Sequence, residues 1–187
     1  MKVSFIGPSG TGKSYLANHV RERYGLPLCP VGSRSVSAAM GFASPYDVDA
    51  AGKRDEFQRR LFVEKLQWEE MHQDGFVTDR THLDNLAYHA LHGGDISDAD
   101  VLARYEATRD YDVVFYVPLH AGQWLGDDPA RKKELGYHRV FDALASGLLN
   151  RAIPGRFVTI VHREKADRVG HVNAVLDGFR ARRVGHY

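Results

Sequence analysis

Apolar and polar positions follow two different periods along this chain. Short apolar runs, each about the length of a strand, alternate with longer segments in which apolar residues recur every three or four positions, as on one helix face. The runs predict five strands, at residues 2–6, 26–31, 76–79, 112–118 and 157–161. Strands that alternate with helices predict an α/β fold with a five-stranded parallel sheet, the first strand central, and helices on both faces.

The helical periods lie between these strands. Leu16, Val20 and Tyr24 form the first apolar stripe, and Gly25 with Pro27 stops that helix. Further helices are predicted at 33–40, 55–73, 83–91, 97–109 with Ser97 as N-cap, around the stripe Val140, Phe141, Leu144 and Leu148, and at 165–181. Residues 41–52 predict a loop, because proline, glycine and aspartate leave them little periodicity.

Composition narrows the class of protein. The 187 residues predict one domain, 1–187, and their formal net charge of +1 argues against a dedicated nucleic-acid binder. The single cysteine, Cys29, needs no oxidising compartment and is expected to be a packed apolar residue. No apolar run approaches the roughly 18 to 20 residues that cross a bilayer, and no signal-peptide layout is present, so we expect a cytoplasmic protein. The sequence leaves open whether the chain forms a homodimer.

Residues 7–14 carry the strongest motif, the Gly-x-x-x-x-Gly-Lys-Ser pattern of a phosphate-binding loop between a predicted strand and a predicted helix. Backbone amides of the stretch Gly10, Thr11, Gly12, Lys13 and Ser14 are expected to bind ATP phosphates, with the Thr11 side chain in solvent. Lys13 should reach the β- and γ-phosphates, and the Ser14 hydroxyl should bind Mg²⁺. The alternative is a glycine-rich turn that merely connects strand to helix.

The third predicted strand ends in Asp79-Arg80. A mechanical ATPase would be expected to end a longer apolar strand with paired acids, so this ending favours a kinase. Strand ends converge on the ligand crevice of an open α/β sheet. Asp79 could then orient Mg²⁺-bound water or the acceptor oxygen, and Arg80 could hold an anion. The alternatives are a surface ion pair or a helix-capping aspartate.

The run from Asp79 to His89 resembles the Asp-Arg-aromatic…Ala-Tyr-Gln signature of thymidylate kinases. With the phosphate-binding loop, the chain looks like the P-loop nucleoside and nucleotide kinases, including phage deoxynucleoside monophosphate kinases and the kinase domain of bifunctional nicotinamide-nucleotide enzymes. The resemblance implies a three-layer P-loop NTPase fold with a helical lid. It also implies that Arg80 grips the acceptor phosphate and that Asn85 and Tyr88 contact the acceptor base and sugar. A polar cap and a core aromatic are their alternative roles.

The chain departs from the thymidylate kinase signature at two positions. Ser9 stands where that family has an aspartate, and Thr81 stands where it has a bulky ring. The contact of the aspartate with the sugar hydroxyl is therefore in doubt, and a specific preference for thymidylate is not expected.

The acceptor end of the site is predicted from three further residues. Arg34 follows the second predicted strand, where the resemblance implies a phosphate-binding arginine, and no acidic residue lies between Leu26 and Ser44 to act as a base. Both features favour a monophosphate acceptor, although Asp79 could serve as the base and Arg34 could be a solvated helix residue. Gln58 and Phe62 would wall the acceptor pocket, with core packing as the alternative role of Phe62.

Residues 119–136 are expected to form the lid. Their Asp-Asp-x-x-Arg layout resembles the lid of nicotinamide-riboside-kinase-like proteins, which would bring Arg131 onto the transferring phosphate. The alternative is local pairing of these cations with Asp127 and Asp128. Arg163 follows the fifth predicted strand, where such kinases enclose adenine.

Together these residues predict ATP- and Mg²⁺-dependent phosphoryl transfer to a (deoxy)nucleoside monophosphate. The expected catalytic residues are Lys13, Asp79, Arg80 and Arg131, with Ser14 and Asp79 at the metal. A nucleoside or nicotinamide riboside kinase is the alternative enzyme. A nucleotide-sensing module without catalysis is the alternative outside the enzymes.

Overall fold

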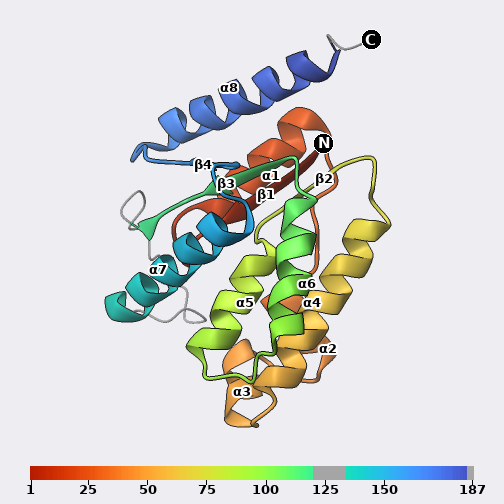
Figure 1. The fold of residues 1–187 in the computed structure, drawn as a ribbon, viewed down its shortest axis with the longest axis vertical. Coiled ribbons are helices and arrows are strands. Elements are labelled where there is room, and N and C mark those ends of the chain that lie inside the picture. Colours follow the sequence, from red (N-terminus) through yellow and green to blue (C-terminus); the bar gives the residue numbers. More distant parts are fainter. Residues whose placement is uncertain (120–133, 185–187) are drawn as a thin grey trace.

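The computed structural model describes residues 1–119 and 134–184. Helices pack on both faces of a parallel sheet, so the predicted α/β architecture is confirmed (Figure 1). The described elements are β1 (Lys2–Ile6), α1 (Lys13–Tyr24), α2 (Ser33–Ala39), α3 (Pro45–Ala50), α4 (Arg54–Glu70), β2 (Phe76–Thr78), α5 (His82–Leu91), α6 (Asp98–Arg109), β3 (Val113–Tyr116), α7 (Leu135–Ala152), β4 (Phe157–Thr159) and α8 (Lys165–Val184).

The sheet of the described chain has four parallel strands in the order β2-β1-β3-β4. The strand before the phosphate-binding loop, β1, lies inside the sheet as predicted. Ser4 pairs with Thr78 on one side and with Val114 on the other. Parallel strands bring their carboxyl ends to one edge, so the loops that follow β1 and β2 meet there.

The predicted strand at residues 26–31 is reduced to a single bridge, from Leu28 to Val77. Two hydrogen bonds hold it: the Cys29 N–H donates to the Val77 carbonyl, and the Val77 N–H donates to the Pro27 carbonyl, both at 2.9 Å. Pro27 has no N–H to donate to the neighbouring strand, so the ladder cannot extend toward the amino end of this segment. The prediction of five strands was therefore wrong, because this segment does not form a strand of the sheet.

The predicted loop at 41–52 contains the short helix α3. Ser44 is its N-cap and accepts from the Asp47 N–H, while the Asp47 carboxylate accepts back from the Ser44 N–H at 2.8 Å. Pro45 occupies the first turn, where its fixed φ suits a helix. Local capping thus builds a helix that apolar periodicity did not reveal.

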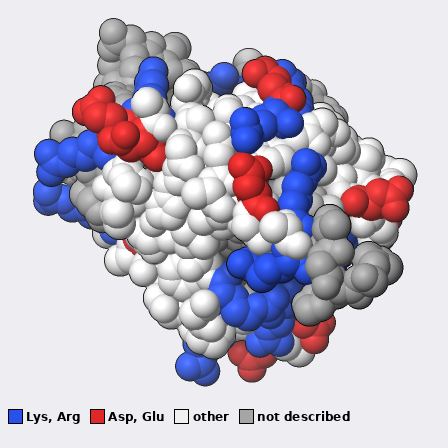
Figure 2. Space-filling view, turned by 90° about the horizontal axis from the view of Figure 1, so that it is seen from above, with Lys and Arg blue, Asp and Glu red and all other residues white. Residues whose placement is uncertain are grey.

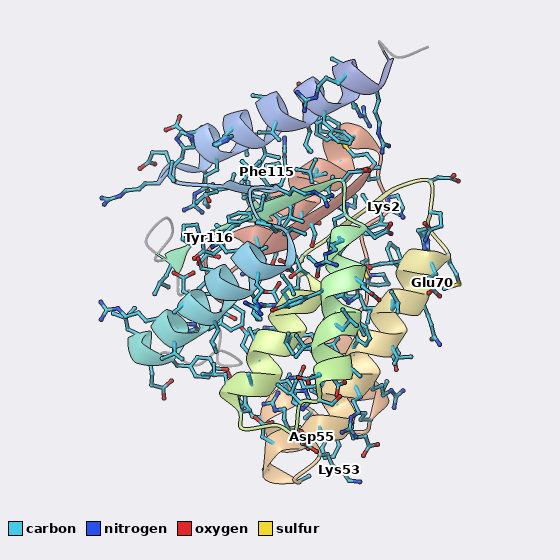
Figure 3. All side chains as sticks on the ribbon, in the orientation of Figure 1. Lys2, Lys53, Asp55, Glu70, Phe115 and Tyr116 are labelled. Atoms are coloured by element: carbon cyan, nitrogen blue, oxygen red, sulfur yellow. The ribbon has the colours of Figure 1, made fainter. Side chains whose placement is uncertain are left out.

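Alternation along the strands divides the core between the two faces of the sheet. Val3 and Phe5 of β1 pack with α1 and α8, whereas Ile6 packs with α5 and α7. Phe115 and Tyr116 of β3 divide in the same way, and both can be followed in Figure 3. The sheet is therefore covered on both faces, which leaves the loops at its carboxyl edge to form a site.

Three smaller predictions are settled by the described elements. Ser97 is the N-cap of α6, and its hydroxyl accepts from the Asp100 N–H at 3.1 Å. Cys29 is buried, and burial raises the pKa of its thiol, as expected for a packed residue. None of the helices that the structure describes is both long enough and apolar enough to cross a membrane.

Candidate functional site

A cavity of about 820 Å³ opens at the carboxyl edge of the sheet. The phosphate-binding loop forms one end, α2 and α3 the other, and α4 and α5 the wall between them. Most of the sequence-predicted residues line it: Gly10, Gly12, Lys13, Ser14, Arg34, Gln58, Phe62, Asp79, Arg80, Asn85 and Tyr88. The lining as a whole runs from Ser9 to Lys165, so segments up to 156 positions apart in the sequence supply one cavity.

Two of the predicted residues that the structure describes, Thr11 and Arg163, do not line this cavity. The Thr11 side chain, expected in solvent, is fully buried, and its hydroxyl donates to the Pro8 carbonyl at 2.9 Å. Arg163 is exposed on the surface outside the cavity. Arg131 lies outside the described residues, as does most of the predicted lid at 119–136.

The loop itself has the conformation that its glycines permit. Gly10 and Gly12 have φ of 80° and 90°, in the left-handed region that side chains other than glycine rarely adopt. A Cβ on Gly7 would lie 2.1 Å from the Val117 carbonyl oxygen, so β3 can approach the loop only at glycine. The Lys13 ammonium donates to the Pro8 carbonyl at 2.5 Å, which keeps it folded over the loop.

Arg168 on α8 supports this loop from behind, and the sequence analysis did not find it. Its guanidinium donates to the Thr11 carbonyl at 2.7 Å and to the His162 carbonyl at 2.9 Å. Only 1% of the residue is exposed, and burial lowers its pKa. An arginine remains charged at any physiological pH, so its charge is held directly beneath the loop. No local motif marks a contact that spans 157 positions of the sequence.

Ser14 and Asp79 meet between β1 and β2. The Ser14 hydroxyl donates to Asp79 Oδ2 at 2.5 Å. The other carboxylate oxygen, Oδ1, is buried and has no hydrogen-bond partner among the described residues. A hydroxyl and a carboxylate with a spare oxygen are a fitting pair for Mg²⁺, which binds proteins through one or two such groups and takes its other ligands from phosphate and water.

Arg80 lies at the centre of a polar cluster next to the loop. It donates to Asp84 at 3.0 Å and to the Ser9 hydroxyl at 3.1 Å, and it stacks 5.0 Å from the ring centre of Tyr88. Burial alone would lower the pKa of Arg80, but Tyr88, Asp84 and Asp79 outweigh it and raise the pKa. Ser9, a departure from the thymidylate kinase signature, thus joins Arg80 and the Tyr88 hydroxyl, 3.1 Å away.

Asp84 fixes this cluster to the start of α5. Its Oδ2 accepts from the Thr81 N–H at 2.7 Å and from the Thr81 hydroxyl at 3.0 Å, and its Oδ1 accepts from Arg80 and from the Gly7 N–H at 3.5 Å. Burial raises its pKa, against the opposing charges of Arg80 and Lys13. The second departure, Thr81, is therefore a helix cap, and the spacing Thr81-x-x-Asp84 is the signal that could have identified it.

A chain of hydrogen bonds fixes the wall formed by α4 and α5. Asn85 donates to the Gln58 side-chain oxygen at 2.6 Å and accepts from Arg104 at 2.8 Å. Arg104 is 1% exposed and lies 4.3 Å from the ring centre of Phe62. Both polar atoms of the Asn85 amide are engaged in the wall, so its structural role is evident, and Phe62 presents a partly exposed ring to the cavity.

The far end of the cavity contains residues that the sequence analysis missed. Arg54 forms an ion pair with Asp49, and the His92 ring lies 2.9 Å from the Tyr137 hydroxyl. Tyr137 lies in the first turn of α7, so α3, α4, α5 and α7 all contribute to this end. α3 was predicted as a loop, and the contact between His92 and Tyr137 crosses 45 positions, so neither feature was visible locally.

Cations outnumber carboxylates in the described lining, although Arg54, Lys65 and Arg80 each pair with a carboxylate just outside it. Its only carboxylate is Asp79, whereas six of its side chains are lysine or arginine: Lys13, Arg34, Arg54, Lys65, Arg80 and Lys165. Arg34 is exposed on α2 and also lines the cavity. Such a lining suits a ligand, or a pair of ligands, with several negative charges.

Comparison with known protein families identifies the family of this chain. A model of the family described as AAA domain (AAA_28) matches residues 2–166. The chain belongs to this family. A search of curated proteins found no match.

Solved structures resemble this AAA-domain protein over most of its length. Deoxyadenosine kinase from M. mycoides with the products dCMP and a flexible dCDP bound has a TM-score of 0.68 at 14% identity, over 95% of this chain and 100% of that one. The same enzyme with bound dATP gives 0.66 at 14% identity, over 95% and 99%. With bound dCTP it gives 0.56 at 12%, over 95% and 100%. The predicted P-loop kinase fold is thus confirmed.

Proposed function

We propose that the protein transfers the terminal phosphoryl group of ATP to a (deoxy)nucleoside monophosphate, with Mg²⁺, to give the diphosphate and ADP. The charge of the cavity carries the proposal. Among the described lining residues, lysine and arginine side chains stand at both ends, and Asp79 is the single carboxylate. ATP and a phosphorylated acceptor are both anions, so the lining cations would neutralise charge on both.

Lys13 and the backbone of residues 10–14 would hold the ATP phosphates at the phosphate-binding loop. Because Arg168 and the Thr11 hydroxyl fix the loop from beneath, its shape is ready before the nucleotide arrives. Ser14 and Asp79 would hold Mg²⁺, and the spare oxygen of Asp79 supports this assignment. Bound Mg²⁺ would neutralise charge on the β- and γ-phosphates.

Arg80 and Arg34 would hold the acceptor phosphate. Asp84 and Ser9 orient the Arg80 guanidinium beside the loop, which would place the acceptor in line with the γ-phosphate. Transfer would then be direct, without a covalent enzyme intermediate. Arg131, outside the described residues, stays a predicted lid residue in this scheme.

The wall of α4 and α5 would receive the acceptor base. Phe62 offers a ring face for stacking, and Tyr88 lies beside Arg80 where the sugar would sit. The Gln58 side-chain oxygen is already occupied by Asn85. Gln58 would therefore contact a base through its NH₂ donor, which favours a base edge that presents an acceptor. Because ATP and such acceptors are intracellular, the proposal also assigns the protein to the cytoplasm.

A nucleoside kinase is the second candidate, and one observation favours it. Asp79 is the single carboxylate of the described lining, so it could accept the proton of an unphosphorylated hydroxyl. Its bond with Ser14 argues for the metal role instead, because one carboxylate would have to serve both tasks.

The deciding experiment incubates the protein with ATP, Mg²⁺ and a panel of nucleosides, nicotinamide riboside and nucleoside monophosphates. We expect ADP release that depends on a monophosphate, with the diphosphate as product. Product from nucleosides alone would move the assignment to the nucleoside kinase. ADP release without any acceptor, or none at all, would contradict both kinase readings and leave a plain ATPase or a nucleotide-sensing module.

A further inference from the structure

A second cavity, of about 390 Å³, lies at the opposite edge of the sheet from the phosphate-binding loop. The start of β3, the end of α6, the turn before β4 and the last turns of α8 enclose it. Four arginines line it: Arg109, Arg156, Arg182 and Arg183. Figure 2, which views the molecule from the α8 side, shows basic side chains gathered in one part of this face.

The carboxylates of this cavity are already engaged. Asp110 pairs with the Lys2 ammonium at 2.5 Å, at the amino end of β1 (Figure 3). Asp112 accepts from the Lys2 N–H at 2.8 Å and from Arg183 at 2.7 Å. Within the described chain, no carboxylate forms an ion pair with Arg109, Arg156 or Arg182. Three guanidinium groups therefore face one cavity without a carboxylate to balance their charge.

Contacts position three of the lining residues, Arg109, Arg183 and Tyr111, whereas Arg156 and Arg182 are exposed. Arg109 is held through Nε by the Ala152 carbonyl at 3.0 Å, which leaves its two terminal nitrogens as donors. Arg183 lies 4.9 Å from the ring centre of Phe179. Tyr111 is 3% exposed, and its hydroxyl is fixed by Glu69 at 2.8 Å, so its ring is a firm wall.

We propose that this arginine cavity binds a polyphosphate group. Guanidinium groups bind phosphate oxygens in a bidentate way, and groups from three separate segments can surround several phosphates at once. Its volume lies within the range of small-molecule sites and is large enough for a di- or triphosphate. The group could come from a nucleotide or from inorganic polyphosphate, since both present the same phosphate chemistry.

The test measures binding and not turnover, so its result is independent of the proposed phosphoryl transfer. Inorganic tripolyphosphate is titrated calorimetrically into the Lys13→Ala protein, which weakens the competing site at the phosphate-binding loop. We expect saturable binding of one equivalent. Adding Arg156→Ala and Arg182→Ala should weaken it roughly tenfold or more, because two charge-assisted contacts are lost.

The matched control adds Arg59→Ala and Arg151→Ala, two exposed arginines outside both cavities, to the same background. It removes the same charge and should bind as tightly as Lys13→Ala alone. Equal weakening in the two double replacements would reduce the effect to net charge and overturn the proposal. Binding of a single-stranded oligonucleotide but not of tripolyphosphate would also overturn it.

A second titration separates the two sources of the polyphosphate group. ATP that binds the arginine cavity as tightly as tripolyphosphate indicates recognition of the phosphates alone. ATP that binds more tightly indicates an added contact with the nucleoside, for which the lining offers the rings of Phe179 and Tyr111. In either case the Arg156→Ala/Arg182→Ala protein must lose the binding. Thermal unfolding of each variant checks that the fold is retained.

Discussion

The Arg80 side chain is held in one orientation by its neighbours and still offers its positive charge to the cavity. Its bonds to Asp84 and Ser9 fix the plane of the guanidinium, and its stacking on Tyr88 leaves an edge toward the cavity. About 30% of the side chain is exposed, so an anion can still reach it. Arg34 differs, because it is exposed on α2 and supports no part of the core.

Replacing either arginine with alanine should raise the acceptor KM by tens of fold, since each loses a charge-assisted contact worth roughly 1.5 to 3 kcal/mol. The KM for ATP should change much less for Arg34→Ala. Arg80→Lys should restore only part of the loss, because lysine lacks the planar fork. Arg59→Ala, on the exposed side of α4, is the control. Equal losses with nucleoside and monophosphate acceptors would refute the acceptor-phosphate role.

Lys13→Ala should lower kcat by about a hundredfold or more, as expected when one preorganised charge is removed from a transferring phosphate. The change should leave far-UV circular dichroism intact, because the ammonium contacts the loop and not the apolar core. Steady-state kinetics with saturating ATP is the measurement. Turnover within tenfold of the unaltered protein would contradict the role of Lys13.

At the scale of one element, the first turn of α5 joins helix stability to the site. The Thr81 hydroxyl accepts from the Leu83 and Asp84 N–H groups, at 3.1 and 3.2 Å, and Asp84 returns the capping contact. The same Asp84 carboxylate holds Arg80 and approaches Gly7. The cap therefore transmits its geometry to both anion-binding parts of the cavity.

Thr81→Ala should lower the free energy of unfolding by about 1 kcal/mol, the usual cost of losing an N-cap. It should also raise the acceptor KM, since Asp84 loses its bond from the Thr81 hydroxyl and keeps only the bond from the backbone N–H of residue 81. Ser97→Ala removes the equivalent cap of α6, which lies outside the cavity, and should cost similar stability with unchanged kinetics. Urea denaturation and steady-state assays measure the two effects. Similar kinetics in both variants would show that the α5 cap does not influence acceptor binding.

At the scale of the whole molecule, a buried polar network joins α4, α5 and the sheet. Glu69 accepts from the Tyr111 hydroxyl at 2.8 Å, lies 2.7 Å from the His82 ring, and pairs with Lys65 at 3.4 Å. Lys65 in turn donates to the Arg80 carbonyl at 2.7 Å. A network between these layers fixes their relative position, and removing one member leaves buried charge unpaired.

The network predicts that acid destabilises the protein. Burial lowers the pKa of His82 in spite of Glu69, and its Nδ1 is buried with no hydrogen-bond partner among the described residues. The unfolded chain therefore binds that proton more tightly, so stability falls as the pH drops below the ordinary histidine pKa of about 6.5. For Glu69, burial alone would raise the pKa, but Lys65 and His82 lower it, and its contribution is lost at still lower pH.

Two measurements check this dependence. The His82 ring, followed by NMR, should titrate below about 6.5. His82→Gln keeps a donor toward Glu69 without a titrating ring, so its unfolding free energy should depend less on pH between about 7 and 5.5. A His82 pKa above the ordinary value, or an equally steep dependence in the variant, would rule out this source of acid sensitivity.

The sequence by itself determined the features that adjacent residues build. The phosphate-binding loop follows from eight contiguous residues, because its φ values and its amides belong to one short backbone segment. The first strand, the Ser97 cap and most helices follow likewise from local period and capping. Even the missed helix α3 was encoded locally, in the capping box of Ser44 and Asp47.

Only the tertiary structure decided which distant residues meet. Arg168 reaches the Thr11 carbonyl from 157 positions away, and Arg104 orients the wall through Asn85. The predicted strand at 26–31 has a strand-like composition, yet it pairs with β2 only through one bridge, from Leu28 to Val77. Local sequence patterns likewise did not predict that Thr11 is buried or that Arg163 lies outside the cavity. Such outcomes depend on how helices and sheet pack, and packing brings together side chains whose proximity no local sequence period encodes.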